Sequence, residues 1–164
     1  MAQREGSTHQ DGHRPGTAVR SEEASGHELP AATTRDVVVL RLPAAGAYLS
    51  VLRTATASLA SRLDFTIDDI EDLRIAVDEA CAMLLPQAMA GAELECTFEL
   101  TADAIQVDVS VLTLDGRVPS RDTFAWTVLT ALAGEVDSSL DADNRVTLSL
   151  HKRKADLTAT GAPS

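Results

Sequence analysis

The stretch DLRIAVDEACAML, residues 72–84, carries the side chain with the clearest chemical potential in this sequence. Glu79 stands in a helical pattern, on the side away from the apolar residues. A glutamate so placed can act as the general base of a phosphate-transferring site. It can equally be a solvated side chain on the polar face of an amphipathic helix. Both interpretations are open until the neighbouring residues are considered.

The cysteines and histidines do not form a metal-binding pattern. Cys81 and Cys96 stand among apolar neighbours and lack C-x-x-C spacing, so we expect two buried free thiols in a reducing compartment. His9 and His13 lie in a polar segment, where an idle tail is favoured over a metal role. We therefore predict no metal site.

The composition limits the kinds of partner and the compartment. The net charge is −11, whereas proteins that bind nucleic acid or anionic membranes need clustered Lys and Arg. We expect neither as a partner, and a basic protein partner is compatible. The sequence shows neither a secretory apolar region nor an apolar run of about 20 residues, so we expect a soluble, cytoplasmic protein.

The chain divides into a folded domain and two tails. Residues 1–34 are rich in Ser, Thr, Gly, His, Glu and Arg and have few large apolar side chains, which predicts disorder. Residues 35–152 carry regular apolar patterns and are expected to form one domain, and 153–164 a flexible tail. Alternation of apolar and polar residues predicts strands over 36–42, 92–100, 104–112, 136–140 and 145–151. Helical periodicity predicts three helices: one over 44–62, one that is capped by Thr66 and stopped by Pro86, and one over 122–133.

The predicted element order is β-α-α-β-β-α-β-β. Short hairpin links imply a mostly antiparallel sheet, and three one-sided helices must then cover one face of it, which predicts an α/β two-layer sandwich of the α+β kind. The side chains expected to face inward from the helices include Tyr48, Val51, Leu52, Ala55, Leu59, Ile67, Ile70, Leu73, Val77, Cys81, Leu84, Phe124, Val128, Leu129 and Leu132.

Three stretches, in this order, carry a resemblance to a known family. They are LRTATASLASRLDFTIDDIEDLRIAVDEACAML, VDVSVLTLDGRVP and DTFAWTVLTALAGEVD. Together they resemble the first helix and N-box helix, the first glycine box and the second glycine box of the small serine-kinase anti-sigma factors. These proteins belong to the GHKL superfamily of histidine-kinase-like ATPases. The resemblance implies a Bergerat-type ATPase fold, which agrees with the predicted element order.

The N-box determines what Glu79 can do. In the family a glutamate is the general base, and an asparagine four residues later holds the magnesium that bridges the ATP phosphates. The glutamate matches Glu79, preceded by Asp78, but Met83 stands at the asparagine position. A thioether is a soft, weak ligand, whereas Mg²⁺ requires hard oxygen ligands. With Met83 there, a solvated Glu79 is favoured over a working base.

The first glycine box departs from the family pattern D-x-G-x-G. Aligned on Pro119, this chain has Thr113 where the adenine-binding aspartate stands, and both glycines are replaced. A gapped alignment makes Asp115 and Gly116 the nucleotide-binding candidates beside Glu79, but the glycine pair is still missing.

The second glycine box departs as well. It expects G-x-G, and residues 123–125 read TFA, with Trp126 next. Cβ atoms and a bulky Phe124 oppose the approach of backbone amides to phosphates. The resemblance therefore implies a degenerate member, without ATP or Mg²⁺ as cofactors and with the kinase activity lost or very weak. An active serine kinase that phosphorylates its antagonist with Mg-ATP is the alternative.

Partner binding is the family property that we expect this sequence to retain. In the family an arginine on the first helix contacts both the sigma factor and the antagonist, and it aligns with Arg53. The resemblance implies an anti-sigma factor that sequesters a sigma factor of the sigma-B/sigma-F type and is released by an anti-anti-sigma STAS-domain protein. It also implies a homodimer. An ordinary exposed helix arginine, and a scaffold whose target is not a sigma factor, are the alternatives.

Overall fold

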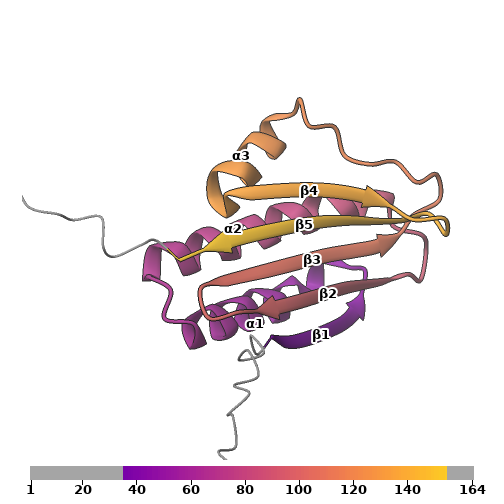
Figure 1. Ribbon diagram of the computed structural model, residues 1–164. Coiled ribbons are helices and arrows are strands. Elements are labelled where there is room, and N and C mark those ends of the chain that lie inside the picture. The colour runs from indigo at the N-terminus through magenta and orange to yellow at the C-terminus, as the bar shows by residue number, and fades with distance from the viewer. Residues whose placement is uncertain (1–34, 155–164) are drawn as a thin grey trace, which may run out of the picture. The chain divides into compact units, whose positions relative to one another are not determined.

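The computed structural model describes residues 35–154, which lie within one compact unit, Thr33–Ser164. The tail predicted over 1–34 lies outside the described residues, and so do residues 155–164 of the tail predicted over 153–164. Arg153, the first residue of that predicted tail, is instead the last residue of a strand. The described chain forms two layers, with an open sheet in front and helices behind it (Figure 1). No helix of this part of the chain is both long enough and apolar enough to cross a membrane.

The helices and strands follow the predicted order. In sequence they are β1 (Asp36–Pro43), a 3-10 helix (Gly46–Tyr48), α1 (Leu49–Arg62), α2 (Ile67–Leu84), a second 3-10 helix (Leu85–Gln87), β2 (Glu93–Leu100), β3 (Ala104–Leu112), α3 (Phe124–Ala133), β4 (Glu135–Leu140) and β5 (Arg145–Arg153). Pro86 lies in the second 3-10 helix, directly after the end of α2.

The sheet has five antiparallel strands in the order β1-β2-β3-β5-β4 (Figure 1). Its helix-facing side is apolar because every second residue points that way. In β2 and β3 these buried residues are Leu94, Cys96, Phe98, Leu100, Ile105, Val107, Val109 and Val111. The predicted two-layer α/β sandwich is confirmed.

Helix α2 is the central helix and contacts α1, α3, β3 and β5. The Thr66 hydroxyl caps its start by accepting a hydrogen bond from Asp69 N at 3.1 Å. Phe65 and Ile70 occupy the two positions of a hydrophobic staple around this cap. Six side chains of α2 are buried in the core: Leu73, Ala76, Val77, Ala80, Cys81 and Leu84.

Some inward-facing predictions were wrong. Ile67 is 79% exposed and Phe124 84% exposed, because each begins its helix and lies before the turns that reach the core. Tyr48 and Val51 are also exposed. Helix α1 instead buries a narrow line formed by Leu52, Thr56 and Ala60. Thr56 can be buried because its hydroxyl donates to Leu52 O at 2.8 Å.

Lys152, near the end of β5, joins three elements. Its Nζ lies 3.0 Å from Asp69 Oδ1 and 3.5 Å from Asp72 Oδ2, and it donates to Leu132 O at 2.9 Å. The side chain of Lys152 is only 14% exposed, so these contacts are screened less than a surface pair. One ammonium group therefore holds the start of α2 and the end of α3 against the sheet.

Lys152→Met is expected to lower the free energy of unfolding by about 2 kcal/mol at pH 7, because Asp69, Asp72 and Leu132 O lose their donor. Burial would raise the pKa of Asp69, but hydrogen bonds from Thr66 and Lys152 and the Lys152 charge outweigh it and lower that pKa. Its stabilising contribution is therefore present above about pH 4 and lost as the pH falls through the lowered pKa.

Urea unfolding at pH 7 and in acid measures the effect of Lys152→Met. The difference between wild type and variant should shrink in acid, and the adjacent exposed Arg153→Met should change little. Equal stabilities of wild type and Lys152→Met at pH 7 would contradict the assigned role.

Candidate functional site

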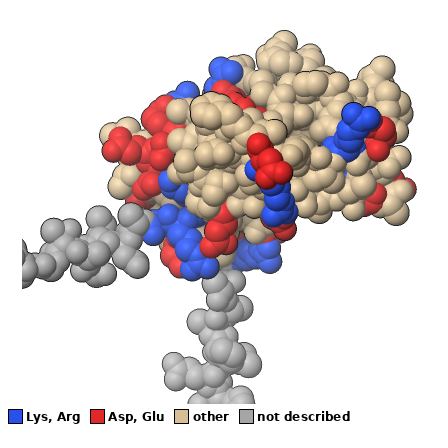
Figure 2. Space-filling model, turned by 90° about the horizontal axis from the view of Figure 1, so that it is seen from above, with Lys and Arg blue, Asp and Glu red and all other residues tan. Residues whose placement is uncertain are grey.

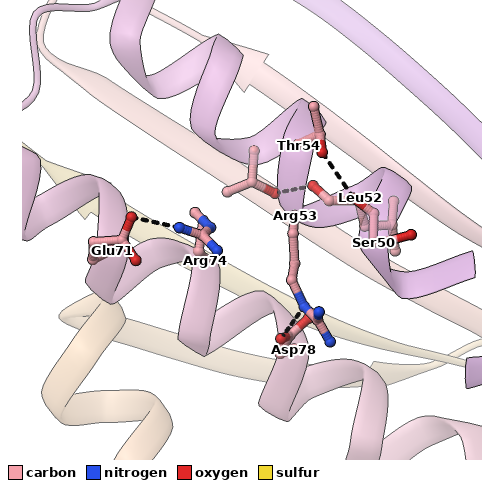
Figure 3. Close-up of polar contacts among 8 residues, drawn as sticks. Ser50, Leu52, Arg53, Thr54, Glu71, Arg74 and Asp78 are labelled. Carbon is pink, nitrogen blue, oxygen red and sulfur yellow. Dashed lines mark hydrogen bonds and ion pairs between the residues drawn. The ribbon is translucent and has the colours of Figure 1, made fainter.

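The predicted partner residue Arg53 lies where α1 crosses α2. Its Nε donates to Asp78 Oδ2 at 2.5 Å, so the side chain reaches across from the first helix to the second (Figure 3). The Arg53 side chain is 44% exposed and that of Asp78 is 31% exposed. The contact thus places a partly exposed guanidinium group on the outer surface of the helix pair.

The N-box residues Asp78, Glu79 and Met83 are all half-buried on α2, but they make different contacts. Glu79 is half-buried, and its neighbour Asp78 makes the ion pair with Arg53. Met83 is also half-buried and packs against the hydrophobic core. A side chain that packs there as an apolar group does not supply the oxygen ligand that Mg²⁺ requires. Within residues 35–154 no group of three or more His, Cys, Asp or Glu side chains is placed to hold a metal ion.

The two cysteines are buried free thiols, as predicted. Burial, with a smaller contribution from the charge of Asp78, raises the pKa of Cys81 to about 12. Burial also raises the pKa of Cys96 well above its usual range. Since the thiolate is the reactive form, neither cysteine has the character of a nucleophile or a metal ligand.

Thr113, which stands at the predicted adenine-recognition position, uses its hydroxyl and its backbone N–H in hydrogen bonds within the protein. Its hydroxyl donates to Asn144 O at 2.8 Å and accepts from Gly116 N at 3.0 Å. Its backbone N–H also donates to Asn144 O at 3.0 Å. Thr113 is 1% exposed, so these bonds attach the end of β3 to the β4–β5 turn in a dry environment. Thr113 therefore has a structural role in this fold.

The nucleotide-binding candidates Asp115 and Gly116 form the turn after Thr113. Asp115 forms an ion pair with Arg117 at 3.1 Å. Gly116 has φ +61°, and a Cβ there would lie 2.8 Å from Asn144 Oδ1 and 3.1 Å from Leu140 Cδ1. Close packing against the β4–β5 turn therefore explains the glycine, without any phosphate-binding role.

The second glycine box forms the start of α3. The Thr123 hydroxyl caps the helix by accepting from Trp126 N at 3.2 Å. Trp126 is 8% exposed, and the guanidinium of Arg121 lies 5.1 Å from its ring centroid. Arg121 also forms an ion pair with Asp137 on β4. Thr123 and Ala125 thus stand at the two glycine positions of the box, and Trp126, the next residue, is buried against the fold.

The charges are distributed unevenly over the helices. Helix α1 contains Arg53 and Arg62 and no carboxylate, and α3 contains no charged residue. Figure 2 accordingly shows a wide uncharged area beside paired acidic and basic side chains. Helix α2 carries six carboxylates and one arginine, Arg74, which is paired with Glu71 at 2.5 Å. Helix α1 is therefore the basic element beside an acidic one.

The structure brings together only some of the predicted site residues. Arg53 meets the N-box through Asp78, whereas Asp115 and Gly116 pack on the β4–β5 turn. Sequence reasoning missed Asp78 as the partner of Arg53 and Asn144 as the partner of Thr113. The D-E pair at 78–79 was a signal for the first, because one carboxylate of such a pair can take an arginine on a neighbouring helix.

The fold defines a class, the two-layer α/β sandwich with a five-stranded antiparallel sheet and three α-helices. A solved structure of the RsbU and RsbW domains of a Mycobacterium tuberculosis protein has a similar fold, with a TM-score of 0.57 and 15% sequence identity. The match covers 72% of this chain and 32% of that one. No family model matches the sequence.

Two relatives named RsbW make the likeness specific. This chain is 34% identical over 93 residues to an anti-sigma-F factor RsbW of Mycobacterium tuberculosis, covering 57% of this chain and 55% of the relative. It is 35% identical over 81 residues to a serine-protein kinase RsbW of Bacillus velezensis, covering 48% of this chain and 51% of the relative. The chain thus spans about half the length of these relatives, and the resemblance to serine-kinase anti-sigma factors is confirmed.

Proposed function

We propose that this protein is an anti-sigma factor that binds an alternative sigma factor of the sigma-B/sigma-F type in the cytoplasm and keeps it from RNA polymerase. The observation that carries the proposal is the partly exposed Arg53 of α1, a helix without carboxylates. Asp78 of α2 holds the Arg53 side chain. Its likeness to a protein named anti-sigma-F factor supports the same function. Arg53 is the residue assigned to partner contact.

The proposed release step uses the same surface. An anti-anti-sigma protein with a STAS domain would compete for α1 and so free the sigma factor. A single exposed guanidinium can serve two competing partners in turn, because each occupies the same donors. Competition at α1 makes release depend on the concentrations and affinities of the two partners, without a chemical step.

ATP and Mg²⁺ are not part of the proposed function. Met83 packs on the core, the Thr113 hydroxyl is used within the fold, and Thr123, at the first glycine position of the second box, caps α3. These residues do not fit the nucleotide. An active serine kinase is the second candidate, because a relative of Bacillus velezensis is named a serine-protein kinase and Glu79 is retained.

Co-purification tests the proposed function directly. A tagged full-length protein expressed at its natural level should retain a sigma factor, identified by mass spectrometry, and should inhibit transcription from the matching promoter in a purified system. Adding the STAS-domain protein should restore transcription. If the tagged protein inhibits no sigma-dependent transcription, the anti-sigma function is contradicted and the scaffold alternative is favoured.

A second copy of the chain is a further proposed partner. Strand β1 pairs only with β2 among the described strands, and it exposes Val37 and Val39. A hollow of about 520 Å³ beside it is lined by Leu40, Val51, Ala55 and three hydroxyl side chains of α1. Co-expression of tagged and untagged copies checks this: the untagged copy should appear in the eluate, and its absence would contradict self-association.

A further inference from the structure

The ion pair between α1 and α2 raises the question of what Asp78 does for Arg53. Arginine has a long side chain whose rotamer freedom must be lost when a partner binds it. In this protein the Nε of Arg53 already donates to Asp78 Oδ2, and the side chain lies across the helix pair (Figure 3). This contact would restrict the rotamers of Arg53 before any partner arrives.

The geometry leaves the rest of the guanidinium available. The contact with Asp78 uses Nε, and 44% of the Arg53 side chain is exposed. Figure 3 shows the guanidinium group of Arg53 beside the Asp78 side chain, with the dashed contact made by Nε. Since a guanidinium has five donors, one bond to Asp78 does not compete with a partner's acceptor for the terminal ones.

Asp78 also depends on Arg53. Its Oδ1 atom is buried, and no residue in the described part of the chain hydrogen-bonds to it, while Oδ2 faces Arg53. A partly buried carboxylate in this position is stabilised by the nearby positive charge. The two side chains therefore hold each other in one arrangement.

We propose that Asp78 is a positioning residue that pre-orders Arg53 for partner binding, a role that rests on the proposed function. Asp78 fixes the guanidinium by Nε and presents the terminal nitrogens to the sigma factor. Pre-ordering increases affinity because the partner no longer bears the entropy cost of fixing the side chain. The N-box aspartate thus serves the partner surface, independently of a nucleotide.

The pre-ordering itself can be measured without a partner. In the ¹⁵N NMR spectrum of the full chain, the Arg53 Nε–H signal, assigned by its absence in Arg53→Lys, should exchange slowly with water. Asp78→Ala should make that exchange fast. Glu71→Ala, which removes the similar but exposed partner of Arg74 on the same helix, should leave the Arg53 signal unchanged. Equal exchange rates in wild type and Asp78→Ala would overturn the proposal.

The consequence for binding is tested with the sigma factor recovered by co-purification. Asp78→Ala should raise the dissociation constant about tenfold, whereas Asp78→Asn, which keeps an acceptor oxygen, should raise it less than about threefold. Glu71→Ala should have no effect. Thermal unfolding of each variant verifies that the fold is intact.

A double-mutant cycle separates positioning from general destabilisation. If Asp78 acts through Arg53, Asp78→Ala should add less than about a twofold change in the Arg53→Ala background. A tenfold effect in that background, or unchanged or tighter binding by Asp78→Ala alone, would overturn the positioning role while leaving the anti-sigma function intact. If Arg53→Ala itself has no effect on affinity, the proposed partner surface fails as well.

Discussion

Arg53→Glu is expected to weaken binding of both the sigma factor and the STAS-domain antagonist by about 100-fold, which corresponds to about 2.7 kcal/mol. The variant removes a partly exposed donor and places a carboxylate in the partner interface. Because both partners are proposed to use the same surface, both dissociation constants should rise together. Surface plasmon resonance with the two purified partners measures them.

The same substitution also brings a new carboxylate next to Asp78, so it needs controls. Like charges at that distance destabilise the helix pair, and a part of the binding loss could come from unfolding. Arg53→Gln removes the charge without the repulsion and should still weaken both complexes. Arg62→Glu reverses the other arginine of α1, at its last turn, and should leave both affinities near the wild-type values. Retention of both partners by Arg53→Glu would refute the shared surface.

Local sequence patterns were sufficient for the element order and for the strands. Alternation places Leu94, Cys96 and Phe98 on the buried side of β2, because the period of a strand leaves no other choice once one face is covered. The Thr66 cap of α2 was also predicted from residue type. These features depend on neighbours within a few residues of the chain.

The wrong and missing predictions concern contacts between distant segments. Helix α1 turns Thr56 and Ala60 toward the core because small side chains allow a close approach, so Val51 is exposed although it is more apolar. The bond from Arg53 to Asp78 spans 25 residues. The bond from Lys152 to Asp72 spans 80 residues. Periodicity within one helix contains no information about which residue of another helix it will meet.

Titration of the wild-type protein with Mg-ATP is expected to give no saturable heat up to about 1 mM nucleotide. A working site that binds ATP at about 1 μM would differ by at least about 1,000-fold, or about 4 kcal/mol. The expected loss is this large because metal coordination, adenine recognition and the phosphate cradle are altered together. Each of Met83, Thr113 and Trp126 now serves the packing of the fold.

The structure also explains why a simple reversion should not restore ATP binding. Met83→Asn returns a hard oxygen ligand, but Thr113→Asp would replace the hydroxyl that donates to Asn144 O with a carboxylate that cannot donate. The double variant is therefore expected to be less stable than Met83→Asn alone and to remain without measurable ATP affinity. Wild-type binding at micromolar affinity, together with phosphate transfer to the STAS-domain protein that Glu79→Ala abolishes, would instead establish the kinase. In that case the bonds of Thr113 would have to open for the nucleotide, which hydrogen exchange at Thr113 N and Gly116 N would detect.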